Sequence, residues 1–243
     1  MQPDSIGSRG YAPIMATVRE IPTSPRIPAS LADVSNWSLA DELVIADSQV
    51  GGDFSGQSAT GVVFERCRIS NAQLTGAILN RLRCTDVLVD RSVLSGADLD
   101  ESSFTRVEFR DCRMSGVLFS RCTFADVLVS TSRLEEASFR MSRTKAVLFQ
   151  DVDLHDGDFY AATLEDTRFF DCNLTGAEFS KATLPGVRFH GSTLFDLKGS
   201  QYLAGAVIDS SQVLPLGLGL LSAHNIAVEN ERDPSPSTDR GGR

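Results

Sequence analysis

The side chains with the greatest capacity for acid–base chemistry are concentrated in one short segment. Between residues 151 and 178 there are eight carboxylates and one cation, Arg168, so the local net charge is 1 − 8 = −7. The eight are Asp151, Asp153, Asp156, Asp158, Glu165, Asp166, Asp171 and Glu178. Paired carboxylates act as general acid and base when a cleft shifts their pKa values and excludes water. Whether Asp151 and Asp153 could work in this way depends on the surface that carries them.

Five cysteines and three histidines are the other candidates for metal binding or nucleophilic chemistry. They form no C-x-x-C, H-x-x-x-H or H-E-x-x-H spacing, and the chain contains no glycine-rich phosphate loop, nucleophile elbow or kinase motif. We therefore expect no metal, no cofactor, no disulfide and no enzymatic activity, with the cysteines acting as small buried hydrophobic residues. The positions are Cys67, Cys84, Cys112, Cys122, Cys172, His155, His190 and His224.

The overall composition narrows the class of partner. The chain has 243 residues and a formal net charge of −9, which argues against direct nucleic-acid binding because that requires an excess of lysine and arginine. No apolar run reaches the length of a membrane span or a secretory signal. We expect a cytoplasmic protein that binds neither nucleic acid nor membrane directly.

The element that must position the carboxylates is visible as a strict period of five. When residues 51–195 are written in blocks of five, the fourth place is apolar from Phe54 to Leu194, with Thr144 as the one clearly polar exception. Twelve of the 14 phenylalanines fall on this register. The frame extends back through Val34, Leu39 and Val44, with a polar interruption at Gln49.

The place two residues before each of these positions is also selective. It is mostly alanine, valine or cysteine, as at Val62, Ala97 and Cys122, whereas the remaining three places are mostly polar. A period of five fits neither a helix nor a single strand. Repeated without a break, it predicts a solenoid in which each coil buries its apolar side chains against the next. The outer surface of such a rod is convex, so we expect no cleft around the carboxylates.

The repeat resembles that of the pentapeptide-repeat family, whose consensus is A-(D/N)-L-X-X. The clearest matches are NAQLT at 71–75, GADLD at 96–100, DCNLT at 171–175 and GAEFS at 176–180. The resemblance implies an all-β fold, a right-handed quadrilateral β-helix of about eight coils over residues 31–200, with four repeats in each coil. A twenty-residue coil would stack like residues over one another. The expected phenylalanine core is Phe104, Phe109, Phe119, Phe139, Phe149, Phe159, Phe169, Phe179 and Phe189.

The segments outside the repeat have different compositions. Residues 1–30 hold five of the nine prolines and are expected to form a flexible or extended leader, and residues 229–243 a disordered tail. Residues 201–228 are similar to the short helix and following strand that end many members of the family. They are expected to cap the rod or to join two rods as a homodimer. The apolar residues expected to serve this role are Val213, Leu214, Leu216, Leu220 and Leu221.

Two functions remain open. In one branch of the family, rod-shaped acidic proteins mimic duplex DNA, bind DNA gyrase or another type II topoisomerase, and protect it from quinolones. The carboxylates between 151 and 178 would then form an acidic stripe that attracts a basic groove. The alternative is a generic scaffold that docks another protein, with the carboxylates as an ordinary solubilising face.

Overall fold

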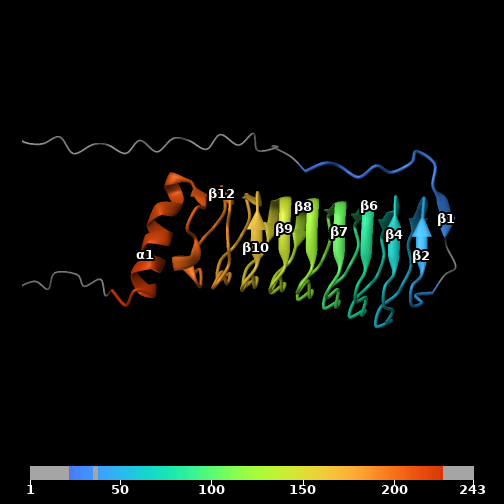
Figure 1. Ribbon diagram of the computed structural model, residues 1–243, viewed down its shortest axis with the longest axis horizontal. Helices are drawn as coiled ribbons and strands as arrows, with labels where there is room; N and C mark the ends of the chain where they lie inside the picture. Colours follow the sequence, from blue (N-terminus) through green and yellow to red (C-terminus); the bar gives the residue numbers. More distant parts are fainter. Residues whose placement is uncertain (1–21, 35–37, 227–243) are drawn as a thin grey trace, which may run out of the picture.

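Each repeat contains one backbone corner of the same kind. In the computed structural model, which describes residues 22–34 and 38–226, every fifth residue from Arg66 to Asp196 has a positive φ between 47° and 76°. This left-handed conformation favours Gly, Asn and Asp, which explains their recurrence at this place. Four such corners in twenty residues bend the chain into a square coil, and the coils stack into a rod (Figure 1).

Strands on successive coils pair in parallel through the whole rod. From β6 onward the register is usually twenty residues, as in Phe149 opposite Phe169 and Phe169 opposite Phe189. One row contains ten strands in succession, so the right-handed solenoid has about nine coils and a length of about 43 Å at 4.8 Å per coil. The strands are β1 Ala32–Val34, β2 Val44–Ala46, β3 Ser48–Val50, β4 Val63–Glu65, β5 Arg68–Ser70, β6 Arg83–Asp90, β7 Ser103–Arg110, β8 Thr123–Arg133, β9 Arg143–Asp153, β10 Thr163–Glu165, β11 Arg168–Phe170, β12 Arg188–His190 and β13 Val207–Ile208.

The predicted core is confirmed. All nine phenylalanines named from the sequence are buried, and Phe159, Phe169, Phe179 and Phe189 are fully so. Their rings form parallel stacks along the axis, with centroids about one coil apart; Phe159 lies 5.0 Å from Phe139 and 4.9 Å from Phe179. Neighbouring stacks meet edge to face, which is the arrangement that the ring quadrupole favours.

Polar residues on the inward register are matched by hydrogen bonds. Thr144, the exception in the apolar place, is buried beside Thr167, and their hydroxyl oxygens are 2.5 Å apart. Serines in the small place also accept from the backbone one coil earlier: the Ala72 N–H donates to Ser92 Oγ at 3.1 Å. A hydroxyl can therefore replace a small apolar residue here without leaving a polar group unpaired.

The first coil departs from the predicted frame. Val44 is 62% exposed, and Gln49 is exposed, whereas Ile45 and Val50 are buried. Ile45 pairs with Phe64 and Val50 with Ile69, each nineteen residues apart. The inward spacing is thus six residues from Leu39 to Ile45 and four from Val50 to Phe54, so one extra residue is compensated by one missing residue. The sequence frame through Val44 was wrong for this reason.

Part of the N-terminal segment expected to be a leader lies against the rod. Figure 1 shows residues 22–30 as an extended segment that runs back from β1 along the solenoid. The backbone N–H of Thr23 donates to Asp126 Oδ1, and that of Arg26 to Asp86 Oδ1, each at 3.0 Å. We call residues 22–30 the strap. Residues 1–21, and the predicted tail at 229–243, lie outside the described residues.

The C-terminal segment caps the last coil with helical elements. Two 3₁₀ turns, η1 Ser200–Tyr202 and η2 Ser210–Gln212, flank β13, and helix α1 covers Val213–Ala223. Strand β13 continues the row of β12 before the helix begins, whereas the strand predicted to follow the helix lies largely outside the described residues. Gln212 is buried and donates from Nε2 to the carbonyls of Phe189 and Ser192. No helix among the described residues is long and apolar enough to cross a membrane.

Candidate interaction surface

The eight carboxylates predicted to form a stripe surround the rod. In a twenty-residue coil, only Asp151 with Asp171 and Asp158 with Glu178 share a column, and the parallel bridge between Asp158 and Glu178 confirms that the second pair is stacked. The other four occupy different columns on several sides. The carboxylates therefore form a band around two successive coils, and we call the eight residues the acidic band.

Half of the acidic band has a cationic neighbour. Asp158 pairs with Arg140 at 2.7 Å and Glu165 with Lys145 at 3.1 Å. Asp156 lies 3.9 Å from Lys198. Asp153 Oδ1 is 3.0 Å from His155 Nδ1, and this hydrogen bond raises the pKa of the imidazole. These pairs are solvent-accessible and leave little net charge at their positions.

The other half has no ion pair with any described residue. These carboxylates are Asp151, Asp166, Asp171 and Glu178. Glu178 accepts a hydrogen bond from the Ser180 backbone N–H at 2.6 Å. Within residues 22–34 and 38–226, this half of the band therefore has no cation paired with it.

In the coils nearer the N-terminus, some corner aspartates form ion pairs with arginines of the next coil. Arg106 Nε is 2.6 Å from Asp86, and Arg66 Nε is 2.6 Å from Asp47, so corner carboxylates alternate with corner arginines one coil away. In both pairs the guanidinium holds the pKa of the aspartate below its usual value. In this corner column, Asp47 and Asp86 are neutralised by arginines one coil further along, whereas Asp166, in the same column, has no ion pair with a described residue.

The backbone gives a structural reason for several of these residue types. Asp151, Asp156, Asp166 and Asp171 all occupy left-handed corners, with φ between 47° and 54°, where aspartate is favoured. The corner does not require aspartate, because Thr131 and Ala146 adopt the same conformation in the neighbouring coils. Local geometry therefore permits the acidic residues without explaining why they gather in two coils.

The surface around Asp151 and Asp171 is hollowed but open. A shallow depression crosses three successive coils beside the C-terminal ends of β8 and β9, and Arg133 is the one cation among the described residues that line it. Such an open surface can contact another macromolecule. The residues that line it are Thr131, Ser132, Arg133, Asp151, Val152, Asp153, Asp171 and Asn173.

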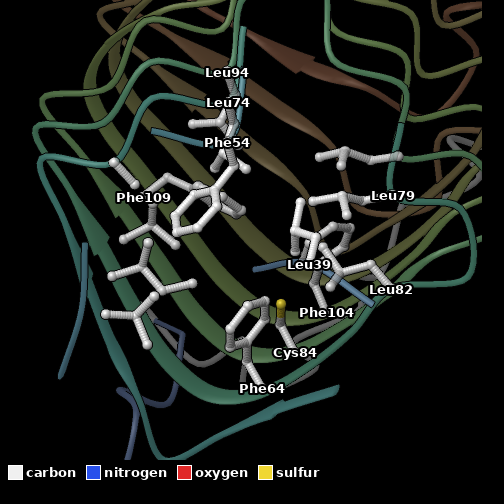
Figure 2. Close-up of a pocket in the computed structure, with 15 residues that line it drawn as sticks. Leu39, Phe54, Phe64, Leu74, Leu79, Leu82, Cys84, Leu94, Phe104 and Phe109 are labelled. Carbon is white, nitrogen blue, oxygen red and sulfur yellow. The ribbon is translucent and has the colours of Figure 1, made fainter. Parts of the chain in front are cut away.

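The interior of the rod is apolar. At the N-terminal coils, smaller side chains replace phenylalanine and leave a cavity of about 30 Å³. Figure 2 shows the Cys84 thiol pointing into this interior between Phe64 and Phe104. All five cysteines are free and buried, and burial raises the pKa of Cys112 to about 11 and that of Cys122 and Cys172 to about 12. Within the described ranges, no three His, Cys, Asp or Glu side chains are grouped to hold a metal ion.

The cap presents an apolar surface at the end of the rod. Of the five residues predicted for capping or dimerisation, Leu216 is buried and Leu221 is half-buried. Val213, Leu214 and Leu220 are exposed, Leu214 by 72%. Helix α1 therefore seals the core through Leu216 and turns other apolar side chains outward.

Two family models match the repeats found above. The model described as "Pentapeptide repeat region" matches residues 102–169, and "Pentapeptide repeats (8 copies)" matches residues 53–81 and 162–196. The chain belongs to the pentapeptide-repeat family. No curated relative matches its sequence.

Several solved pentapeptide-repeat structures are similar to the chain at low identity. HetL, involved in heterocyst differentiation regulation in the cyanobacterium Nostoc, is 17% identical; the match covers 70% of this chain and 84% of HetL, with a TM-score of 0.38. Full-length QnrB1, a plasmid-mediated fluoroquinolone resistance protein, is 21% identical over 75% of this chain and 97% of QnrB1, with a TM-score of 0.30. A protein of the Arabidopsis thaliana thylakoid lumen is 25% identical over 39% of this chain and 66% of that protein, with a TM-score of 0.37.

Sequence reasoning missed the residues that hold the strap and the cap against the solenoid. Asp86 and Asp126 anchor the strap, and Asp209 anchors the cap by accepting from Gly191 N–H at 2.6 Å and from His190 Nδ1 at 2.9 Å. Their partners lie between 18 and 103 residues away, so no local motif reveals them. The signal that was available is the three-residue spacing of Pro22, Pro25 and Pro28.

Proposed function

We propose that the protein is a non-enzymatic interaction module that presents its acidic band to a cationic surface of a partner protein. The supporting observation is the contrast between the two parts of the rod. Near the N-terminus, three corner acids (Asp47, Asp86 and Glu101) are paired with arginines, whereas Asp151, Asp166, Asp171 and Glu178, gathered in two coils, have no ion pair among the described residues.

The physical consequence is repulsion that a partner can relieve. Asp151 and Asp171 are one coil apart, a distance of about 5 Å between adjacent strands, and like charges so close destabilise each other. Binding of a lysine- or arginine-rich surface would remove this repulsion. It would also accelerate association by electrostatic steering.

The specific partner that we propose is the DNA-binding surface of DNA gyrase or another type II topoisomerase, with protection from quinolones as the consequence. A duplex of about 43 Å would carry on the order of twenty-five phosphate charges, whereas the whole chain has a net charge of −9. We therefore propose that the acidic band makes the contact and that the rest of the rod supplies width and rigidity.

A supercoiling assay with purified gyrase, with and without a quinolone, tests this proposal. We expect wild-type protein to inhibit supercoiling or reduce quinolone-induced cleavage at micromolar concentration. The variant Asp151→Asn, Asp166→Asn, Asp171→Asn, Glu178→Gln should require at least about tenfold more protein, given the size of steering effects. Asparagine tolerates the left-handed corner, so the fold should persist.

The matched control removes four charges elsewhere: Glu101→Gln, Asp111→Asn, Glu135→Gln, Glu136→Gln. It should act like the wild type. If wild-type protein has no effect on either reaction, the topoisomerase proposal is wrong. If both variants lose activity equally, net charge rather than the acidic band is responsible.

The exposed helix α1 favours a second candidate, a scaffold that docks a protein through its cap. Val213, Leu214 and Leu218 are more than half exposed, and apolar groups gathered at one end of a soluble rod are typical of an interface. A second copy of the chain is the partner to test first. Sedimentation should give a dimer for the wild type and a monomer for Leu214→Ser; a wild-type monomer at high concentration would refute homodimerisation.

A further inference from the structure

The hydrogen bonds that hold the strap on the rod are regularly spaced. Thr23 and Arg26 are three residues apart, and their carboxylate acceptors, Asp126 and Asp86, are forty residues or two coils apart. Two coils span about 9.6 Å, and one three-residue turn of polyproline II spans about 9.3 Å. One turn of an extended proline-type helix therefore fits two coils of the solenoid.

The sequence of the strap has the same period. Pro22, Pro25 and Pro28 recur every third residue, which places them along one edge of a polyproline II helix. Proline has no N–H to donate, and in the strap it is the residue directly after Pro22 and after Pro25 that donates to the rod. The prolines and the hydrogen-bond donors thus both recur every three residues, and each such interval matches two coils of the solenoid.

The outward residues at the edge of the rod beneath the strap are less exposed than those on another face. Asp86 occupies an outward corner and yet is only 7% exposed. The outward side chains beside this edge, Leu88, Glu108, Leu128 and Leu148, are half-buried or buried. On another face, the outward Ile78 and Leu118 are more than 40% exposed. This edge is therefore covered, whereas an equivalent apolar face is open.

We propose that this edge, marked by Asp86 and Asp126, is a docking track for extended peptides with a proline at every third residue. The strap is its resident occupant. The partner is a P-x-x-P-x-x-P segment of another protein, which replaces the strap by offering the same N–H groups to the same carboxylates. The anchors Asp86 and Asp126 are not members of the acidic band, and the two surfaces share only Asp166, so either proposal can fail without the other.

The two-coil spacing of the carboxylates also predicts the next anchor of the track. Asp166 lies two coils beyond Asp126 in the same corner column, and both are left-handed corners. Leu148 lies between them on the outward face of β9. A partner peptide longer than the strap therefore has a further carboxylate at the spacing that one more turn requires.

A synthetic acetylated peptide of residues 22–30, added to the full-length chain, tests the track by fluorescence anisotropy. The resident strap competes as an intramolecular ligand at high effective concentration. We expect weak binding to the wild type and at least tenfold tighter binding to Thr23→Pro, Arg26→Pro, whose strap keeps its extended conformation but lacks both donors. In this opened chain, Asp86→Asn with Asp126→Asn should lower the affinity at least tenfold, whereas Asp111→Asn, at a corner on another edge, should leave it unchanged.

A change in the peptide alone keeps the test independent of protein folding. Methylation of the two amide nitrogens that correspond to Thr23 and Arg26 should abolish binding to the opened chain. Equal affinity of the methylated and unmethylated peptides would overturn the proposal, as would opened chain that binds no tighter than wild type. A concentration-dependent dimer that disappears in the opened chain would assign the strap to a second copy and would also overturn it.

Discussion

Phe159 illustrates how the rod is stabilised at the level of single side chains. Its ring is fully buried, parallel to Phe139 and Phe179, and edge-on to Phe169 at 5.7 Å. A residue of this kind is enclosed by rings from the coil before, the same coil and the coil after. The space cannot collapse when the ring is removed, because the neighbouring coils are fixed by their backbone ladders.

Phe159→Ala should therefore lower the free energy of unfolding by about 3–5 kcal/mol, the usual range for a buried phenylalanine. Urea denaturation followed by circular dichroism measures it. Phe195→Ala is the matched control because Phe195 is 55% exposed; it should cost about 1 kcal/mol or less. Equal losses for the two variants would contradict the assignment of Phe159 to the core.

The cysteines lead to a prediction about reactivity. Burial raises the pKa of Cys84 and of the other four thiols, and a raised pKa lowers the thiolate fraction that reacts. The folded protein should therefore show almost no reaction with Ellman's reagent at pH 8, and five thiols should react in denaturant. Rapid modification of one cysteine in the native protein would contradict this account.

At the scale of elements, the cap depends on one carboxylate. Asp209 accepts from Gly191 N–H and His190 Nδ1, and its own backbone N–H donates to Gln212 Oε1 at 2.8 Å. Gln212 in turn donates to backbone carbonyls of the last coil. The side chains of two residues thus connect the start of helix α1 to the end of the solenoid.

This connection should weaken in acid. The Gly191 N–H, and then His190, lower the pKa of Asp209 from 3.8. A lowered pKa in the folded state means that the stabilisation is present above pH 3.8 and is lost as the pH falls through the lowered value. The Gly191 amide resonance should shift with a midpoint below 3.8 in NMR spectra. Asp209→Asn should abolish that transition; an unchanged Gly191 shift in wild-type protein would refute the assignment.

The regular elements could be predicted from the sequence, and the irregular ones could not. From Phe54 to Leu194 the inward register is confirmed because each coil repeats the same packing problem. The prediction for the first coil was wrong because Val44 is apolar and fits the five-residue frame, whereas the structure buries Ile45 instead. The extended form of residues 22–30 agrees with the predicted flexible or extended leader, but their contacts with the rod could not be predicted, because the anchors Asp86 and Asp126 are distant in sequence.

The composition and placement of the acidic band could be predicted from the sequence, but its ion pairs could not. The local excess of carboxylates is visible directly, and the sharing of one column by Asp158 and Glu178 follows from a twenty-residue coil. The distribution around several sides also follows from that coil length. The ion pairs do not follow from the coil length. Asp158 pairs with Arg140, which is eighteen rather than twenty residues away, because the length and direction of the side chains decide such contacts.

At the scale of the whole molecule, the solenoid is a rigid support with three distinct outer surfaces. The strap covers an edge over the coils of β6–β8, the acidic band surrounds the coils that follow, and the cap exposes apolar side chains at the end. Every described strand pairing is parallel and runs from coil to coil. The positions of these surfaces relative to one another are therefore fixed by the number of coils between them.

The most direct test of the central proposal, that the acidic band binds a cationic protein surface, is the dissociation constant for purified gyrase measured at several salt concentrations. Wild-type protein should bind, and its affinity should fall steeply as salt rises, because the contact is electrostatic. The variant Asp151→Asn, Asp166→Asn, Asp171→Asn, Glu178→Gln should bind at least about tenfold more weakly with a shallower salt dependence. Equal affinity and equal salt dependence for the two proteins would contradict the proposal.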